Sequence, residues 1–218
     1  MKMIFIIICL IVLIGIGLMS CYSVNKIKGS GNLTSENREL PSFNSINSIG
    51  SMNVIINTSD EFNCTITGDD NIIPIVKTKV TNNNLQISTN KNYSSTNELV
   101  VNVNVPNYDK ASITGSGDMN LINFKNENLS LNIAGSGNIT GNGDVQTLTV
   151  EINGSGNIML KDLKSKTTNV TVNGSGDAMF WASESISAVV NGSGSIKYHG
   201  NPTSVNSEVN GSGSIKPQ

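Results

Sequence analysis

Residues 150–158 read Val-Glu-Ile-Asn-Gly-Ser-Gly-Asn-Ile, and close copies of this stretch recur through the second half of the chain. The Gly-Ser-Gly triplet falls at 115–117, 135–137, 154–156, 174–176, 192–194 and 211–213. Successive copies are therefore 20, 19, 20, 18 and 19 residues apart. A nearly fixed period of this length is typical of an array of stacked structural units.

Apolar side chains keep the same place in every copy. Two residues before the triplet stand Ile113, Ile133, Ile152, Val172, Val190 and Val209. The second residue after the triplet is Met119, Ile139, Ile158, Ala178, Ile196 or Ile215. Polar residues alternate with these positions, which is the pattern of half-buried strands, and no stretch has helical spacing. Each unit is predicted to hold strand, Gly-Ser-Gly bend and strand, as two or three short strands.

A unit of about 19 residues cannot bury its own apolar face, whereas stacked units can do so at about 4.8 Å per layer. The sequence therefore predicts an all-β solenoid built from ~19-residue repeats, with the aligned Ile and Val side chains inside. Directly before the triplet stand Asn153, Asn173, Asn191 and Asn210. Side-chain amides in register can bond to one another along the stack, so a ladder is expected on the outside or at a corner.

The triplet itself has a structural interpretation and two functional ones. Glycine permits positive φ or a tight bend at a corner of each coil, and six copies in register favour this interpretation. The first functional alternative is a row of backbone amides that cradles an anion or a glycan. The second is calcium binding, as in glycine-rich calcium repeats, although only Asp118 and Asp177 supply a carboxylate directly after the triplet.

The start of the chain has the features of an export signal. Met1-Lys2-Met3 leads into the apolar run Ile4 to Leu18, and the run ends at Leu18-Met19-Ser20-Cys21. This tetrapeptide resembles a bacterial lipobox, which implies cleavage before Cys21 and acylation of that cysteine. Acyl chains together give a stable anchor, where one alone binds a bilayer weakly. The alternative is an uncleaved membrane helix with an incidental cysteine.

Three segments follow from these features: a lipoprotein signal peptide at 1–20, a lipidated N-terminus and tether at 21–41, and the solenoid domain at 42–218. The domain is expected outside the cytoplasm, held to the membrane by its lipid anchor, with the outer membrane or cell surface as the expected place. A further Gly-Ser-Gly lies at 29–31 within the tether.

Composition excludes several classes of function. Charged residues make up 14% of the chain and the net charge is −2, so nothing suggests a nucleic-acid partner. The 33 asparagines are interleaved with Ile, Val and Leu, which argues against disorder. Once Cys9 and Cys21 are assigned to the signal and the anchor, Cys64 is the remaining thiol. It alternates in phase with Ile66, so it is expected to be a small buried side chain, and no disulfide or cysteine metal site is predicted.

No residues form a recognisable catalytic set, and no metal or cofactor is predicted. His199 stands in Lys-Tyr-His-Gly-Asn-Pro, which is typical of an exposed turn. Asp69 and Asp70 follow Gly68 and are expected to be turn residues, with acid–base chemistry as the alternative. Phe180 and Tyr198 share a core column, so Trp181 is expected to point outward. Trp181 is the one predicted ligand contact, because an indole can stack on a sugar ring or another protein.

The first half of the domain adds a series of motifs in a fixed order. They are Phe43-x-x-Ile46, Val54-Ile55-Ile56, Thr67-Gly68-Asp69, Leu85-x-Ile87, Val101-x-Val103-x-Val105-Pro106 and Ile113-x-Gly115-Ser116-Gly117-Asp118. Together with the later repeats, this order resembles the head GIN domain family of bacterial auto-transporter adhesins over residues 42–215. The resemblance implies a right-handed β-helix-like domain in a secreted or lipid-anchored protein. It supplies no catalytic residues.

The predicted function is therefore a non-catalytic cell-envelope lipoprotein whose solenoid binds a glycan or a protein, as an adhesin. One alternative is a structural or assembly component that docks through an end of the solenoid. A lesser alternative is a carbohydrate-active enzyme, because related architectures host such enzymes. Oligomeric state does not follow from the sequence.

Overall fold

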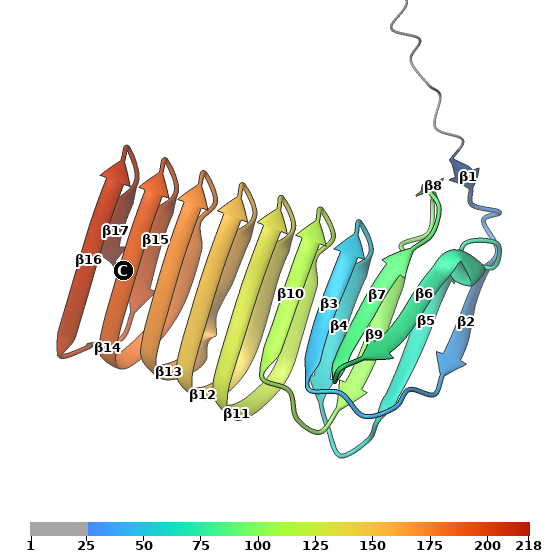
Figure 1. Ribbon diagram of the computed structural model, residues 1–218, viewed down its shortest axis with the longest axis horizontal. Coiled ribbons are helices and arrows are strands. Elements are labelled where there is room, and N and C mark those ends of the chain that lie inside the picture. Colours follow the sequence, from blue (N-terminus) through green and yellow to red (C-terminus); the bar gives the residue numbers. More distant parts are fainter. Residues whose placement is uncertain (1–25) are drawn as a thin grey trace, which may run out of the picture.

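The computed structural model describes residues 26–218, and over this range the chain is a β-solenoid (Figure 1). The predicted all-β fold with stacked repeats is confirmed. The predicted signal peptide and Cys21 lie outside the described residues. Fifteen strands form one continuous sheet that winds through the coils, and the coils follow one another in chain order from β10 to β17.

The central coils are each one long strand that bends as it circles the core. They are β11 (Met119–Gly135), β12 (Asn138–Gly154), β13 (Asn157–Gly174) and β14 (Ala178–Gly192). All neighbouring pairs are parallel. The expectation of two or three short strands per unit was wrong here, because hydrogen bonding to the coils on both sides continues nearly unbroken around the bend.

Shorter strands complete the coils on either side of this central stack. The first coil contains β3 (Ser45–Gly50) and β4 (Asn53–Thr58), and β10 (Lys110–Gly115) leads into β11. β15 (Ser195–His199), β16 (Ser204–Gly211) and β17 (Ser214–Pro217) form the last two coils. Each coil therefore has two long faces: the strand half before the Gly-Ser-Gly corner and the strand half after it.

The N-terminal end of the solenoid differs from the repeats. Next to β3 and β4 lie β7 (Asn84–Thr89) and β9 (Val100–Val105), and antiparallel strands cover these in turn: β6 (Val76–Thr81) on β7, and β5 (Asn63–Asp69) on β9. A 3-10 turn, η1 (Ile73–Ile75), joins β5 to β6. The change from parallel to antiparallel pairing makes this end a cap.

The segment predicted as a tether contributes to this cap. β2 (Leu33–Arg38) pairs antiparallel with β5, and β1 (Ile27–Lys28) pairs with β8 (Tyr93–Ser94). Arg38 Nη1 donates to the carbonyl of Val76 at 2.8 Å, which fastens the end of β2 to the neighbouring β6. From Lys26 onward, therefore, most of the segment is folded against the solenoid instead of hanging free of it.

The core consists of apolar columns that run along the stack, as the repeat predicts. The column before the corner joins Ile113, Ile133, Ile152, Val172, Val190 and Val209 in register. All of these are buried except Val209 in the last coil, which is 41% exposed. Leu121, Leu160 and Phe180 are buried on the other face. Burial of each such side chain stabilises the fold by about 1.5–3 kcal/mol.

Both glycines of the triplet are required at the corner. Gly154 has φ of +139°, and a Cβ there would lie 2.3 Å from the carbonyl oxygen of Gly135 in the preceding coil. A Cβ on Gly156 would lie 2.1 Å from the carbonyl oxygen of Gly137. Backbone packs directly on backbone at this corner, so only glycine fits, and the structural interpretation of the triplet is sufficient to explain its recurrence.

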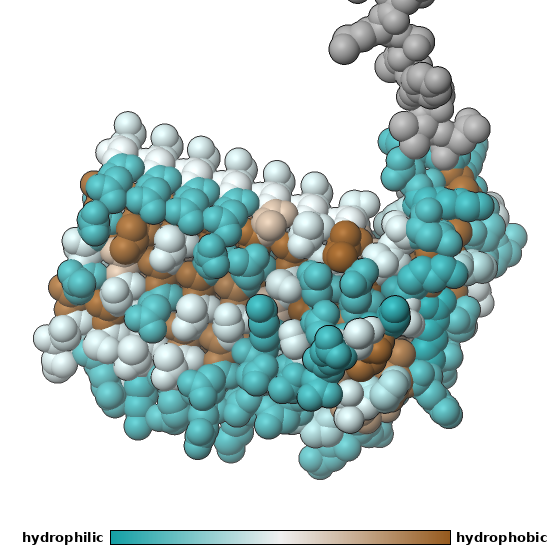
Figure 2. All heavy atoms as spheres, viewed as in Figure 1, coloured by the Kyte–Doolittle hydropathy of each residue, from teal (hydrophilic) through white to brown (hydrophobic). Residues whose placement is uncertain are grey.

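The predicted asparagine ladder is present beside the corner. Asn173 Nδ2 donates to Asn153 Oδ1 at 2.8 Å, Asn191 to Asn173 at 2.8 Å, and Asn210 to Asn191 at 3.0 Å. Figure 2 shows hydrophilic side chains in a regular row across the coils, next to the small residues of the corner. The ladder ties each coil to the next on the outside, where the apolar columns do so on the inside.

The differences in repeat length are confined to one bend, opposite the Gly-Ser-Gly corner. The register between neighbouring coils shifts between Leu121 and Phe124 in β11, between Thr140 and Asn142 in β12, and between Leu160 and Thr167 in β13. Elsewhere the long strands stay in step. The bend absorbs the spacings of 18 to 20 residues, so that the columns on both faces remain aligned.

Candidate functional site

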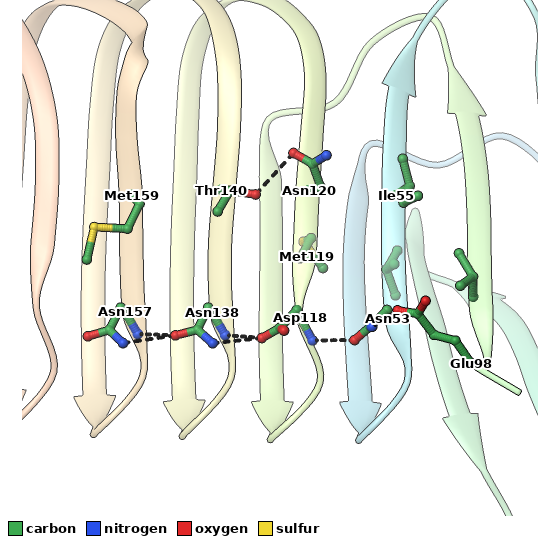
Figure 3. Close-up of a pocket in the computed structure, with 12 residues that line it drawn as sticks. Asn53, Ile55, Glu98, Asp118, Met119, Asn120, Asn138, Thr140, Asn157 and Met159 are labelled. Atoms are coloured by element: carbon green, nitrogen blue, oxygen red, sulfur yellow. Dashed lines mark hydrogen bonds between the residues drawn. The ribbon is translucent and has the colours of Figure 1, made fainter. Parts of the chain in front are cut away.

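The face that follows the corner carries a second ladder, made by the residue directly after each Gly-Ser-Gly triplet and, in the first coil, by Asn53 after Gly50-Ser51-Met52. Its members in successive coils are Asn53, Asp118, Asn138, Asn157, Asp177 and Ser195. Each side-chain oxygen accepts the backbone N–H of the next member: the distances are 3.0, 2.9, 3.2, 2.9 and 2.8 Å along the series. The ladder satisfies the backbone donors that open each strand, and it leaves a straight polar rim along the stack (Figure 3).

The next outward column is mixed in character. It consists of Ile55, Asn120, Thr140, Met159, Met179 and Lys197, which are in register from coil to coil. Thr140 Oγ1 donates to Asn120 Oδ1 at 3.1 Å, and the apolar side chains at 55, 159 and 179 are half-buried. Apolar surface thus alternates with amide and hydroxyl groups across this face. A sugar or a polypeptide presents the same mixture.

The two columns border a long groove, which we call the groove face. One stretch of about 530 Å³ is lined by residues of β4, β11, β12 and β13 together with Glu98 and Val100 (Figure 3). A second stretch of about 620 Å³ shares Asn120, Thr140 and Met159 with the first. Each stretch is lined by residues of four successive coils, so the groove runs along the axis of the solenoid.

A separate hollow of about 380 Å³ lies where this groove reaches the variable bend. Trp181 forms part of its wall, with Lys161, Asp162, Lys164, His199 and Gly200. The hollow shares Lys161 and Asp162 with the groove. Lys164 Nζ lies 4.5 Å from the centroid of the Trp181 ring, a distance at which a cation is attracted to an aromatic face.

The structure brings Trp181 and His199 together and leaves the other candidates apart. Trp181 and His199 are register partners on β14 and β15, and Trp181 is half-buried. His199, expected in an exposed turn, is also half-buried in a strand, and its Nε2 is shielded from solvent without a hydrogen-bond partner. That atom costs free energy as it stands, because its hydrogen bond to water is not replaced.

Asp69 and Asp70 lie at the capped end, far along the stack from Trp181, and hold the chain that leads into β2. Asp69 is fully buried and accepts hydrogen bonds from the Ser95 hydroxyl and the Asn97 amide. Those two donors hold its pKa below the ordinary value. Asp70 accepts from the Ser30 hydroxyl and from Asn32. These carboxylates are fully used in packing one chain segment on another.

Cys64 is fully buried in β5, as its alternation with Ile66 predicts. Burial raises the pKa of its thiol to about 11, and the Arg38 charge opposes this only partly. A neutral, enclosed thiol is a packing group, since nucleophilic and metal-binding chemistry needs the thiolate.

Sequence reasoning overlooked most of the groove face. The second ladder was visible as a run of Asp, Asn and Ser directly after the triplet, and short side chains with an acceptor oxygen are what the backbone N–H groups there require. The sequence carried no comparable signal for the groove, which arises from side chains of different coils. Within the described residues, no group of three or more His, Cys, Asp or Glu side chains could hold a metal ion.

The chain is similar to known proteins in both sequence and fold. The family described as "Putative auto-transporter adhesin, head GIN domain" matches residues 42–202. The chain belongs to this family. No curated protein matches the chain. Among residues 26–218, no helix has the length and apolar character that a membrane crossing requires.

Solved structures extend the comparison of this head GIN domain. A "putative adhesin" from Bacteroides fragilis is 26% identical, has a TM-score of 0.73, and covers 88% of this chain and 100% of its own. A "putative lipid binding protein" from Parabacteroides distasonis is 20% identical (TM-score 0.58, coverage 89% and 100%). A "putative adhesin" from Parabacteroides merdae is 19% identical (TM-score 0.56, coverage 89% and 99%). The latter two likenesses establish the shared fold alone.

Proposed function

We propose that this head GIN domain is a non-catalytic adhesin module that holds a glycan or protein ligand on its groove face, outside the cytoplasm, on a lipid anchor at Cys21. The observation that carries the proposal is the groove whose stretches each cross four successive coils, bordered by a regular polar ladder. Such a surface offers repeated weak contacts to an extended ligand. Membership of an adhesin family supports the same function.

The non-catalytic character is supported by how the titratable groups are placed. The buried carboxylate of Asp69 and the thiol of Cys64 both belong to the capped end, where each has a packing role. The single histidine, His199, has no hydrogen-bonded carboxylate or hydroxyl partner that would make it a base. A ligand held by many weak contacts on the groove face does not need a catalytic residue.

The first experiment measures binding of the full chain, in detergent, to arrays of bacterial and host glycans and to extracellular matrix proteins. Thr140 and Thr149 provide a matched pair, since both are exposed on β12 but lie on opposite faces. Thr140→Arg places a large side chain in the groove and is expected to weaken binding by about tenfold or more. Thr149→Arg is expected to bind like the wild type. Loss of binding with Thr149→Arg alone would move the site to the other face.

The second experiment tests the anchor and its location. Intact cells are treated with protease, and the wild type is compared with Cys21→Ala. We expect the wild-type domain to be digested while a periplasmic control survives, and Cys21→Ala to be released from the membrane fraction. A protected wild-type domain would contradict a surface adhesin. Unchanged membrane attachment of Cys21→Ala would show that the apolar segment at 4–18 is an uncleaved anchor.

Docking through a solenoid end is the second candidate function, and the last described coil favours it. Every residue of β16 is exposed, including Val205 at 43% and Val209 at 41%, and β16 pairs with β14 alone. An unpaired strand edge is a template for a further strand, and a second copy of the chain offers a matching coil. Val209→Lys should then lower the oligomeric state in light scattering. A monomeric wild type would exclude this role for the edge.

A further inference from the structure

The hollow beside Trp181 differs in charge from the rest of the groove face. Lys161 and Lys164 line it together with one acidic residue, Asp162. Within residues 26–218 the ion pairs are Arg38–Glu36 and Lys166–Glu184, so neither of these lysines has a carboxylate within 4 Å. The hollow therefore has an excess of positive charge that the protein itself leaves unpaired.

The position of these charges follows from the variable bend. Leu160 pairs with Phe180, but the next paired residues are Lys164 and Trp181, so β13 has three extra residues here. Leu163, one of the three, is buried, and Lys161 and Asp162 project to the surface. The bulge supplies a wall that the next coil, β14, lacks. It also places Lys164 beside the indole, with its Nζ over the ring.

His199 belongs to the same wall and is in register with Trp181. Its Nε2 is shielded from solvent and has no hydrogen-bond partner, so it lies behind the surface that a ligand would touch. The hollow itself combines an aromatic surface with cations that no carboxylate pairs.

We propose that this hollow binds a carboxylated sugar unit of a polysaccharide, with the rest of the glycan chain lying along the groove. The inference rests on the proposed function and specifies its ligand. A sugar ring has an apolar face that suits the part of the indole that Lys164 leaves uncovered. Its hydroxyl groups suit the amides and hydroxyls of the groove. The carboxylate of the ligand supplies the negative charge that Lys161 and Lys164 lack, and Asp162 accepts a sugar hydroxyl.

A neutral glycan and a polypeptide fit the hollow less well. A neutral sugar leaves both lysines unpaired. A polypeptide cannot add to the sheet on this face as a strand, because the coils already pair with neighbours on both sides. The groove therefore offers side chains alone, in a row along the axis, and a linear chain of sugar units can contact the same columns coil after coil.

The test uses the full chain in detergent and calorimetric titration with oligogalacturonate, a linear chain of carboxylated sugars. The comparison ligand is the same oligosaccharide with its carboxyl groups reduced to alcohols. We expect the acidic chain to bind at least about tenfold more tightly, which is the effect of losing charge-assisted hydrogen bonds. We also expect its affinity to fall as salt is raised. Equal affinity for the two ligands would overturn the inference.

Two lysines on β13 make the matched variants. Lys164→Gln removes the cation over Trp181 and should weaken oligogalacturonate binding about tenfold. Lys166→Gln removes a neighbouring cation that pairs with Glu184 outside the hollow, and should leave binding within about twofold of the wild type, as expected of an exposed ion pair. Trp181→Ala should weaken binding of both the acidic and the reduced oligosaccharide. Equal effects of Lys164→Gln and Lys166→Gln would mean non-specific attraction and would overturn the inference.

The same measurements separate this inference from the proposed function. If Thr140→Arg abolishes binding of some glycan or protein on the array while oligogalacturonate does not bind the wild type, the groove is a binding face and the acidic-sugar inference is wrong. If Thr140→Arg leaves array binding unchanged but Lys164→Gln weakens oligogalacturonate binding, the hollow acts on its own. The acidic-sugar inference is then supported, and the proposal that the groove face holds the adhesin ligand is wrong.

Discussion

The Gly-Ser-Gly triplets at 154–156 and 29–31 have the same three residues in opposite surroundings. In the central stack, a Cβ on Gly156 would lie 2.1 Å from a carbonyl oxygen of the preceding coil. A Cβ on Gly31 would have no atom within 4 Å, and a Cβ on Gly29 would collide with the carboxylate of Asp69. In the stack the motif makes a corner against another corner. At the capped end it passes beside a buried carboxylate.

The comparison shows what gives this motif its structural meaning. A triplet becomes a corner where the corner of a neighbouring coil lies against it, since backbone packs on backbone there. Without such neighbours, the same residues are held by side chains: Ser30 by Asp70, and the Gly31 carbonyl by Asn97. The central stack is stabilised by repetition, and the capped end by individual polar contacts.

The largest expected effect on stability comes from adding one methyl group, by replacing a glycine with alanine, in each of the two triplets. Gly156→Ala should destabilise the protein by about 3 kcal/mol or prevent stacking of that coil, because rigid backbone cannot move aside. Gly31→Ala should cost about 1 kcal/mol, since its φ of +84° is strained for alanine but the space is open. Chemical denaturation measures both changes.

The exposed Ser155 lies between the two corner glycines and serves as the control. Ser155→Ala should change the free energy of unfolding by no more than about 0.5 kcal/mol. If Gly31→Ala and Gly156→Ala were equally destabilising, the distinction between the two regions would be wrong.

An intermediate effect on stability is expected when the pH is lowered. The pKa of Asp69 is lowered mainly by the hydrogen bond from Ser95, then by that from Asn97. A lowered pKa stabilises the fold above the ordinary value of about 4, and this contribution is lost as the pH falls through the lower native value. Asp69→Asn should therefore destabilise the protein at neutral pH and flatten the acid end of its stability profile.

Asp177→Asn is the matched change in the central stack. Its side chain accepts the Ser195 N–H at 2.8 Å, and an amide oxygen can accept the same bond. We expect the acid profile of Asp177→Asn to follow that of the wild type. Denaturant titrations between about pH 3 and pH 7 cover the range in which a carboxylate titrates. An unchanged profile for Asp69→Asn would show that the Asp69 contacts do not stabilise the capped end.

The smallest expected effect is a change in the rate at which Cys64, in the capped end, reacts with a thiol reagent. Because burial raises the pKa of this thiol to about 11, it should react with a thiol reagent at pH 8 only when the capped end opens. Asp69→Asn should speed the labelling of the Cys64 peptide a few-fold, measured by mass spectrometry. Asp177→Asn should not. Fast labelling in the wild type would mean that the capped end is open most of the time.

Sequence patterns predicted the repetitive part of this protein well, because every copy of the repeat reports the same geometry. The columns at Ile152 and Val172, the ladder through Asn153 and Asn173, and the burial of Cys64 all follow from position within an alternation. The family resemblance over the first half of the domain was also confirmed.

The remainder depends on contacts that no local pattern records. The capping strand β2 is exposed along most of its length, so its sequence has no apolar alternation to mark it as a strand. The burial of Asp69 depends on Ser95 and Asn97, which come 26 and 28 residues later. The half-burial of His199 depends on its register with Trp181. Such contacts between distant segments appear only once the coils are stacked.

Because changes in coil length are confined to one bend, the core can stay the same while the surface at that bend varies. The Gly-Ser-Gly corner tolerates no addition, whereas the opposite bend already accommodates coils of 18, 19 and 20 residues without disturbing a column. Insertions at that bend can reshape the hollow beside Trp181 while the core stays as it is. Relatives with the same stack can in this way differ in what they recognise, one loop at a time, and an engineer can graft new contacts at the same place.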